Sequence, residues 1–270
     1  MSLRIHFVRH GETTASREGR LCGLTECELT DGGRLMGSYI ADRCAAAGSW
    51  LAIYSSPLRR CVETGRPAAE RLGLTIAVEQ GLREIDHGAW DGRLESEVAV
   101  DDAQAFRAWQ EHPGWRAAPG GENGYAVAAR AVPVVQAIRD AHGGVDGDLL
   151  VVSHKAVIRA VACGLLGVDV DRYRARLSQP VGAFTTFEFR EGHEDALLLA
   201  LGDVSHLPVD LRPAPGAVGG RAGGARRPPA LTSATRYCSV AVTSIATLPL
   251  SACEMGQPSL ASAAAFSKAA

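Results

Sequence analysis

Arg9 and His10 are the first residues of this sequence whose types and positions could do chemistry. They end an apolar run at 3–8, and Gly11 follows them. The run predicts a buried strand, and the glycine predicts the turn that ends it. Both side chains are therefore expected at the carboxyl end of a strand, where open α/β sheets bind ligands. Arg9 is a fixed cation suited to phosphate, and His10 is a candidate nucleophile or general base.

Comparable side chains recur at three later positions. A second buried-strand pattern, 149–152, is followed by Ser-His154, and a third, 51–54, is followed by Ser-Ser-Pro. The Ser-Ser-Pro triplet predicts a helix start with a serine N-cap, so that Arg60 lies in the first turn, where free N–H groups favour an anion. Glu84 lies in a loop rich in charge and glycine.

This set of side chains matches what hydrolysis of a phosphomonoester requires. Cations must hold the non-bridging oxygens, a nucleophile must attack phosphorus, and an acid must protonate the departing alkoxide. Two arginines, two histidines and one glutamate provide these parts. No metal and no cofactor is required if the arginines supply the positive charge.

Four ordered motifs resemble those of the histidine phosphatase superfamily, also called phosphoglycerate-mutase-like. The resemblance covers residues 3–207. It rests on Arg9-His10-Gly11-Glu12-Thr13, Ser56-Pro57-Leu58-x-Arg60, Leu82-x-Glu84-Ile85-x-x-Gly88-x-Trp90 and Val152-Ser153-His154.

The resemblance implies a role for each of these residues. His10 becomes phosphohistidine, while Arg9, Arg60 and His154 hold the phosphoryl group. Glu84 protonates the leaving oxygen and then activates the water that cleaves the phosphoenzyme. Physical chemistry agrees, because His10 must attack as neutral imidazole, and its second ring nitrogen should then donate to a nearby carbonyl. His154 beside a dianion is more useful charged.

The length of one segment and several further motifs bear on the substrate. His154 lies 70 positions after Glu84, a segment in which mutases of the superfamily carry a longer insertion, so the length favours a phosphatase. The similarity is closest to a bacterial branch with metal-independent phosphoserine phosphatases. It lies in Thr14-Ala15-Ser16-Arg17, Cys22-Gly23, Ser153-His154-Lys155-Ala156-Val157-Ile158-Arg159, Asp171-Arg172-Tyr173-Arg174 and Gly202-Asp203-x-Ser205-His206-Leu207.

Five residues are candidate substrate contacts: Arg17, Cys22, Gly23, Glu122 and Lys155. Arg17 and Lys155 depart from many relatives. Lys155 could bind a substrate carboxylate or, equally, point to solvent at a helix start. Glu122 could meet the ammonium group of phosphoserine or instead cap the following helix.

Three functions are compatible with these residues. The leading one is a metal-independent phosphomonoesterase for small phosphorylated metabolites, with phosphoserine as the best single substrate. The second is phosphoglycerate mutase, which shares the chemistry but transfers the phosphoryl group to another hydroxyl. The third is a relative that binds phosphorylated ligands without catalysis, which five chemically competent residues disfavour.

The element pattern predicts an α/β fold of three layers, with a doubly wound, mostly parallel sheet and an antiparallel hairpin at its edge. A helical lid insertion is expected at about 93–125, with Phe106, Trp109 and Trp115 as its apolar anchors. Strands are expected at 3–9, 51–55, 74–79, 148–153, 183–190 and 196–202, and helices at 31–47, 57–72, 95–111, 122–141, 155–166 and 169–177.

Composition divides the 270 residues into a catalytic domain at 1–210 and a low-complexity tail at 211–270, which we expect to be disordered. Residues 212–270 carry six Lys or Arg and one Glu, which leaves the rest of the chain acidic within a net charge of −2. An acidic body around a locally basic pocket suits a small anionic substrate.

Other features exclude or limit partner classes. Basic residues are scattered without interleaved aromatics, so nucleic-acid binding is not expected. Seven cysteines without a Cys-x-x-Cys pair argue against a disulfide scaffold or a zinc site. No membrane span or signal peptide is predicted, and we expect a cytoplasmic protein. Homodimerisation stays open.

Overall fold

The computed structural model describes residues 1–193 and 195–212. Six strands are present: β1 (Ser2–Arg9), β2 (Trp50–Ser55), β3 (Ile76–Val78), β4 (Gly147–Ser153), β5 (Phe184–Arg190) and β6 (Leu197–Asp203). The α-helices are α1 (Thr14–Glu18), α2 (Asp31–Ala46), α3 (Arg59–Leu72), α4 (Glu95–Asp101), α5 (Ala103–Glu111), α6 (Gly124–Ala141), α7 (Lys155–Leu166) and α8 (Tyr173–Arg176). Short 3-10 turns are η1 (Gln80–Leu82), η2 (Gly88–Trp90), η3 (Val170–Arg172) and η4 (Val209–Leu211).

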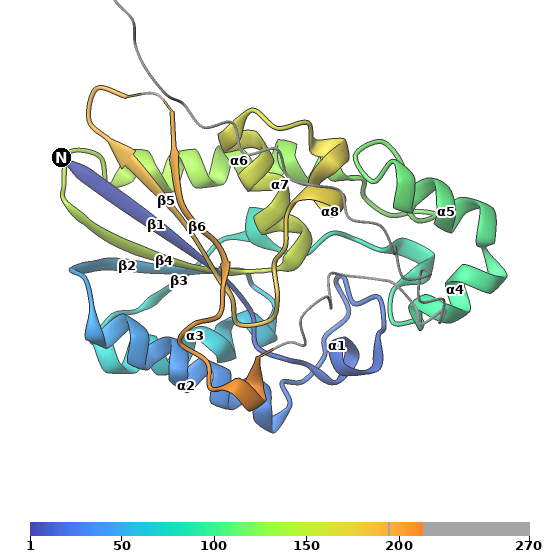
Figure 1. Ribbon diagram of the computed structural model, residues 1–270, viewed down its shortest axis with the longest axis horizontal. Helices are drawn as coiled ribbons and strands as arrows, with labels where there is room; N and C mark the ends of the chain where they lie inside the picture. The colour runs from blue at the N-terminus through green and yellow to red at the C-terminus, as the bar shows by residue number, and fades with distance from the viewer. Residues whose placement is uncertain (194, 213–270) are drawn as a thin grey trace, which may run out of the picture. The chain divides into compact units, whose positions relative to one another are not determined.

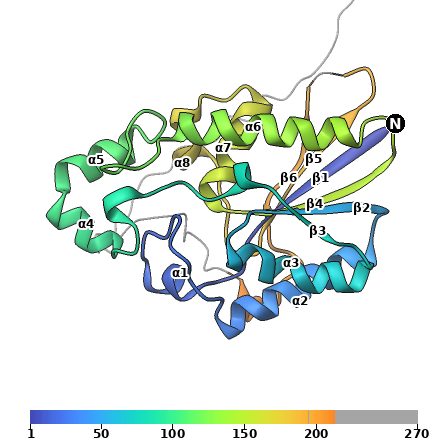
Figure 2. The same ribbon diagram turned by 180° about the vertical axis from the view of Figure 1, so that it is seen from behind.

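The strands form one sheet in the order β3-β2-β4-β1-β5-β6. Strands β1 to β4 pair in parallel, and β5 and β6 pair antiparallel at one edge, as predicted. Helices α6 and α7 cover one face and α2 and α3 cover the other, as Figure 1 shows and Figure 2 repeats from behind. The predicted three-layer α/β fold is confirmed.

Alternating side chains of the central strands explain why both faces are covered. Ile5 and Val151 belong to a buried cluster with α6 and α7, whereas Val8 and Val152 belong to a second cluster with α2 and α3. All four side chains have an exposed fraction of 0%. The sheet is apolar on both sides, which is what a mostly parallel sheet requires.

The strand register decides where the catalytic candidates lie. Arg9 at the end of β1 is opposite Ser153 at the end of β4, and Ser55 of β2 is opposite Val152. Three parallel strands therefore end side by side, and the chain that follows each of them leaves from the same edge.

The predicted helix at 95–111 is wrong in one respect, because it is two helices, α4 and α5. The break lies at Asp102, whose backbone leaves the helical region at φ −120° and ψ 38°. Its carboxylate accepts a hydrogen bond of 2.8 Å from the indole N–H of Trp90. A tertiary contact at this position thus replaces continuous helix.

The lid residues have their own apolar cluster. Trp90, Phe106 and Trp109 are buried in it, which confirms Phe106 and Trp109 as anchors. Trp115 was predicted as a third anchor, and this is wrong. Its side chain is 64% exposed and stacks on Tyr125, with ring centroids 4.2 Å apart.

Several element ends differ from the prediction. The helix expected from residue 57 begins at Arg59, and its N-cap, Leu58, makes no side-chain capping bond. The helix expected from residue 122 begins after Asn123, whose side chain accepts the Ala126 N–H at 2.9 Å. The capping role considered for Glu122 therefore belongs to Asn123. The strand at 74–79 is shorter, the helix at 169–177 comprises η3 and α8, and α1 was not predicted.

The structure describes the first two residues of the predicted tail, Leu211 and Arg212. Leu211 completes η4, and Arg212 donates hydrogen bonds to the Leu207 and Ser205 carbonyls at 2.7 and 3.0 Å. The remaining part of the predicted tail, 213–270, lies outside the described residues. Among the helices the structure describes, none has the length and apolar character needed to cross a bilayer.

Candidate active site

His10 follows β1 directly and is fixed by main-chain contacts on both sides. Its N–H donates to the Ser153 carbonyl of β4 at 3.0 Å, and its Nδ1 lies 2.8 Å from the Gly11 carbonyl oxygen. A carbonyl can only accept, so Nδ1 carries the proton and Nε2 keeps its lone pair. Gly11 is needed here because a Cβ would lie 2.3 Å from the Gly33 carbonyl oxygen.

The surroundings of His10 keep its ring neutral. The side chain is 5% exposed. Burial, followed by the positive charges of Arg60 and Arg9, holds the pKa of His10 well below its ordinary value. The expected form of a nucleophilic imidazole, neutral and with its second nitrogen donating to a carbonyl, is therefore present.

His154 follows β4 and lies edge-on to His10, with ring centroids 5.2 Å apart. It is 0% exposed, and its Nε2 lies 2.7 Å from the Ser56 hydroxyl. The serine N-cap expected for α3 is not formed, because the N-cap is Leu58, and the Ser56 hydroxyl contacts this histidine. Burial and the charge of Arg60 hold the pKa of His154 well below its ordinary value, so the ring is neutral in the ligand-free site.

Arg9 and Arg60 bring two guanidinium groups to His10. Arg60, in the first turn of α3, is 1% exposed and donates to the carbonyls of Gly23 and Thr25 at 2.6 and 3.1 Å. Arg9 donates to the Gln179 carbonyl at 3.0 Å. The Nε atoms of both arginines are buried and have no hydrogen-bond partner among the described residues. Donors remain available for an anion.

The loop that holds Arg60 is itself held by Asp91. The Asp91 carboxylate accepts the N–H groups of Gly23, Leu24 and Thr25 at 2.6, 3.0 and 2.9 Å. Burial acts to raise the pKa of Asp91, but these hydrogen bonds hold it below its ordinary value. Sequence analysis did not single out Asp91. Its place within the Trp90-Asp91-Gly92 motif was the available signal.

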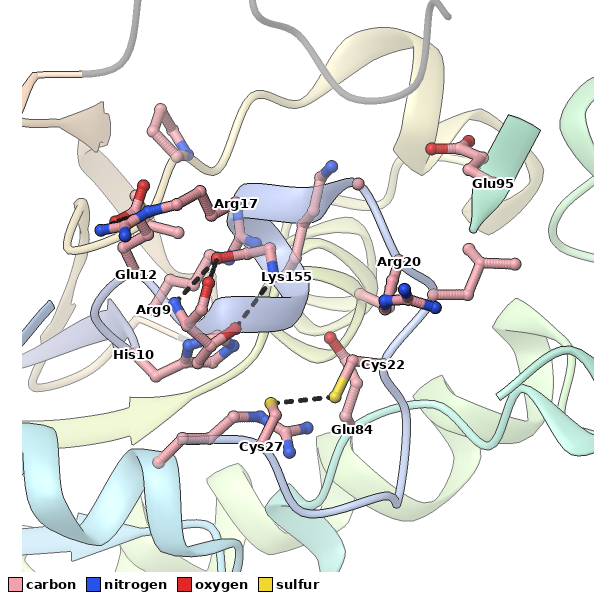
Figure 3. A pocket seen from close by; sticks show the side chains of 18 of the residues that line it. Arg9, His10, Glu12, Arg17, Arg20, Cys22, Cys27, Glu84, Glu95 and Lys155 are labelled. Atoms are coloured by element: carbon pink, nitrogen blue, oxygen red, sulfur yellow. Dashed lines mark hydrogen bonds and ion pairs between the residues drawn. The ribbon is translucent and has the colours of Figure 1, made fainter. Parts of the chain in front are cut away.

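Glu84 contributes the remaining carboxyl group, on the loop after η1. It is 6% exposed, and its Oε1 accepts its neighbour Ile85's N–H at 2.9 Å. The backbone of this loop is held by Arg130 of α6, which donates to the Glu84 carbonyl at 2.9 Å and pairs with Glu122. A positioned carboxyl group therefore faces the same cavity as His10 (Figure 3).

Glu122 does not lie in the cavity, where contact with the ammonium group of phosphoserine would require it. It is not among the described residues that line the cavity. Its two carboxylate oxygens accept from Arg130 at 2.9 Å each, and one also accepts the Asp86 N–H at 3.0 Å. The structure gives Glu122 a place in the support of the Glu84 loop instead.

The cavity has a volume of about 710 Å³. Of the sequence candidates, the described lining includes Arg9, His10, Arg17, Cys22, Arg60, Glu84 and Lys155 but not Gly23, Glu122 or His154. Gly23 acts through its backbone on Arg60. Arg17 is paired with Glu12 at 2.6 Å, and Lys155 faces the cavity rather than open solvent.

Sequence analysis missed several lining residues. One of them is His87, which is 8% exposed and lies edge-on to Trp109 in the cavity wall. Arg159, one helical turn after Lys155, also lines the cavity and is 4% exposed. The available signal was a single arginine in an otherwise apolar helix. Glu95, Tyr173 and Arg174 complete this side.

Comparison with known proteins agrees with this geometry. Phosphoserine phosphatase 1 of Hydrogenobacter thermophilus is 33% identical over 171 residues, which are 63% of this chain and 80% of that protein. Glucosyl-3-phosphoglycerate phosphatase of Mycobacterium tuberculosis is 33% identical over 178 residues, 64% of this chain and 79% of that protein.

Solved structures give the same result. The native mycobacterial glucosyl-3-phosphoglycerate phosphatase superposes with a TM-score of 0.69 and 29% identity, covering 75% of this chain and 99% of that one. The family model described as histidine phosphatase superfamily, branch 1, matches residues 5–201. With the two histidines, two arginines and one glutamate at one sheet edge, these matches show that the chain belongs to branch 1 of the histidine phosphatase superfamily and is a phosphatase.

Proposed function

We propose that this phosphatase hydrolyses small phosphomonoesters without a metal, through a phosphohistidine at His10. The observation that carries the proposal is the state of His10. Its Nδ1 donates to the Gly11 carbonyl at 2.8 Å, so Nε2 is the nucleophilic atom, and Arg9 and Arg60 lie beside it. A fixed, neutral imidazole between two cations suits attack on a phosphate dianion.

In the first step, Nε2 of His10 attacks phosphorus and the ester P–O bond breaks. The lone pair of Nε2 forms the N–P bond, and the electrons of the broken bond go to the leaving oxygen. Glu84 donates its proton to that oxygen, and the alcohol departs. Arg9 and Arg60 hold the non-bridging oxygens, and His154 supports the group from beside His10. His154 takes up a proton from solvent when the dianion binds and offsets the nearby cations, and it returns that proton to solvent when phosphate leaves.

The second step returns the enzyme to its starting state. Glu84, now ionised, removes a proton from water, and the hydroxide oxygen attacks phosphorus. The N–P bond breaks with its electrons returning to Nε2, and inorganic phosphate leaves. His10 is neutral again and Glu84 is again protonated, so atoms and charge balance over the cycle.

Phosphoserine is our proposed substrate. The support is the similarity to phosphoserine phosphatase 1 over 80% of that protein, together with the cavity size. A volume of about 710 Å³ lies within the range of small-molecule sites. Phosphoglycerate mutase is the competing function, because a phosphohistidine could equally transfer its phosphoryl group to a second hydroxyl.

The test is phosphate release from phosphoserine, 3-phosphoglycerate, sugar phosphates and nucleoside monophosphates, with EDTA present and no bisphosphate added. Preferential release from phosphoserine supports the proposal, and broad release supports a general phosphatase. If phosphate is released from none, an assay with acceptor and bisphosphate primer identifies a mutase. Failure of that assay too leaves a relative that binds ligands without catalysis.

His10→Ala tests the mechanism, with His193→Ala as the exposed control. We expect His10→Ala to lose turnover by at least about 10³-fold while its circular dichroism and cooperative unfolding are unchanged. Acid quenching of the wild type with labelled substrate should trap an acid-labile phosphoenzyme that the variant lacks. Ordinary activity in His10→Ala would refute the mechanism.

A further inference from the structure

Two cations in the cavity are used neither by the proposed chemistry nor by the protein itself. Lys155 and Arg159 lie four residues apart on α7, so they share one helix face, and both line the cavity. Neither takes part in an ion pair or a side-chain hydrogen bond with the other residues the structure describes, and Arg159 Nε is fully buried without a partner.

The other charged groups on this side do not neutralise them. Arg174 is stacked over Trp109 at 3.9 Å and lies 3.7 Å from Glu95. Burial, then the charges of Arg9, Arg159 and Arg174, lower the pKa of Lys155 to about 7, against which Glu95 acts weakly. A buried arginine without a counter-ion is costly for a fold to keep. An anion from outside the chain would remove that cost.

We propose that Lys155 and Arg159 form a second anion subsite, which binds a carboxylate on the carbon chain of the substrate while Arg9 and Arg60 bind its phosphate. The inference rests on the proposed function and narrows it to phosphomonoesters that carry a carboxylate. The planar guanidinium of Arg159 can engage both carboxylate oxygens, and the flexible Lys155 adds a point charge.

Glu95 adds a further distinction within this class. It lines the same cavity as Lys155. Its Oε1 lies 3.7 Å from Arg174 and is buried without a hydrogen-bond partner among the described residues. This oxygen can accept from a cationic or hydroxyl substituent beside the carboxylate. An ammonium group gains more from a carboxylate than a hydroxyl does, which favours phosphoserine over 3-phosphoglycerate.

Three substrates separate these contributions. Phosphoserine carries both groups, 3-phosphoglycerate has a hydroxyl in place of the ammonium, and phosphoethanolamine lacks the carboxylate. We expect Arg159→Met to lower kcat/KM for phosphoserine about 10- to 100-fold and for phosphoethanolamine far less, as loss of one charge-assisted bond predicts. Lys155→Met should likewise lower kcat/KM for phosphoserine more than for phosphoethanolamine. It replaces Arg159→Met as the test variant if Arg159→Met does not fold.

Controls keep the subsite and the proposed chemistry apart. Arg176→Met removes an exposed cation that is not in the cavity lining, and it should leave the relative kcat/KM values of the three substrates unchanged. p-Nitrophenyl phosphate reports the chemistry alone. If the wild type hydrolyses nothing, calorimetric binding of phosphoserine and phosphoethanolamine to the same variants still tests the subsite.

The subsite is refuted if Arg159→Met lowers kcat/KM for all three substrates by the same factor, since the arginine would then bind the phosphate that they share. It is also refuted if wild type does not discriminate phosphoserine from phosphoethanolamine. Faster hydrolysis of propane-1,3-diol bisphosphate than of phosphoserine would overturn the carboxylate assignment in favour of a second phosphate. Glu95→Gln should reduce the preference for phosphoserine over 3-phosphoglycerate.

An independent observation concerns the two cysteines of the loop that holds Arg60. The Sγ atoms of Cys22 and Cys27 lie 2.9 Å apart and point toward one another (Figure 3), and both side chains line the cavity. A disulfide needs about 2.05 Å, so less than 1 Å of closure separates them from bonding. The hydrogen bond that Cys22 donates lowers the pKa of Cys27 to about 6, which favours the thiolate.

We infer that this pair is a site of reversible oxidation by peroxides. The Cys27 thiolate attacks one peroxide oxygen, the O–O bond breaks, and the products are a sulfenic acid and hydroxide, which takes a proton from solvent to become water. The Cys22 sulfur then attacks the Cys27 sulfur, which forms the S–S bond and releases a second water. The two thiols lose two electrons in total, and hydrogen peroxide gains them.

Gly23 and Thr25, whose carbonyls accept from Arg60, lie between the two cysteines in the sequence. Formation of the disulfide would therefore move these carbonyls relative to Arg60. We expect peroxide to lower phosphatase activity and dithiothreitol to restore it, with peptide mapping showing a Cys22–Cys27 link. Cys27→Ser should lose the peroxide response relative to its own untreated activity, whereas Cys44→Ala should keep it. A mapped link without a change in activity, or oxidation without that link, refutes the inference.

Discussion

Replacing Arg130 should weaken both the fold and the chemistry, although it touches no substrate. Its guanidinium donates to the carbonyls of Gly81, Arg83 and Glu84 at 2.8, 2.8 and 2.9 Å and pairs with both oxygens of Glu122. Three of these hydrogen bonds join α6 to the loop that carries Glu84, and two hold Glu122. Arg130→Met removes all five and leaves Glu122 with the longer contact to Arg83, at 3.3 Å, as its remaining ion pair among the described residues.

The magnitude follows from burial. The two side chains are 15% and 18% exposed, so water reaches the pair only in part. Breaking a buried pair costs about 3–5 kcal/mol, and partial exposure points to the lower end, about 3 kcal/mol of unfolding free energy. A displacement of Glu84 by about 1 Å can cost about 100-fold in rate, so kcat should fall by about 10- to 100-fold.

The pH dependence gives a second check on this pair. Burial acts to raise the pKa of Glu122, but the bonds from Arg130 and Asp86 hold it below its ordinary value. The folded pKa is depressed, so the stabilisation is present above the unfolded pKa of about 4.3 and is lost as pH falls through the folded value. The difference between wild type and Arg130→Met should therefore narrow in acid.

Urea unfolding measures the stability, and p-nitrophenyl phosphate turnover measures kcat. Glu122→Gln keeps an acceptor and should cost less than Arg130→Met, and Arg139→Met on the same helix is the matched surface control. The reasoning would be refuted if the unfolding free energy of Arg130→Met lay within about 1 kcal/mol of wild type and its kcat were normal. If Glu122→Gln instead raised KM for phosphoserine alone with kcat intact, Glu122 would bind substrate after all.

Three further perturbations test other parts of the site. Asp91→Asn should weaken inhibition by inorganic phosphate and lower kcat/KM by about 10-fold, because the loop that orients Arg60 loses its anionic acceptor. Lys155→Met should raise Tm more at pH 6 than at pH 9. The pKa of Lys155 in the folded protein is about 7, below the ordinary 10.5. The cost of burying its charge therefore applies in full below pH 7 and disappears as pH rises toward 10.5. Gly11→Ala should destabilise the fold by about 1–3 kcal/mol in thermal or urea unfolding, because its Cβ would lie 2.3 Å from the Gly33 carbonyl oxygen.

The positions of His10, His154 and Arg60 could be predicted because strand patterns and their ends are local properties. Apolar runs at 3–8, 149–152 and 51–54 each become strands of one parallel sheet, and parallel strands end at one edge. Roles within the site follow less directly. The Ser56 hydroxyl, for example, contacts His154 at 2.7 Å, although the Ser-Ser-Pro triplet suggested a serine helix cap.

Features set by tertiary partners escaped prediction. The break at Asp102 depends on the Trp90 indole, which lies 12 residues earlier in the chain. Glu122 was given two local interpretations, and its actual partner is Arg130, two helical turns into α6. In both cases a polar side chain satisfied a distant donor rather than the local need that its sequence position suggested.

Arg159 illustrates the same limit from the opposite side. A lone arginine in an apolar helix is interpreted by pattern as an exposed residue, because charged side chains are seldom fully buried without a partner. Here it is 4% exposed with Nε unpartnered among the described residues, so the pattern alone gives the wrong environment. A fold selected only for stability would have replaced or paired this charge. Its retention beside Lys155, in the cavity that holds His10, is explained if the missing counter-ion belongs to the substrate.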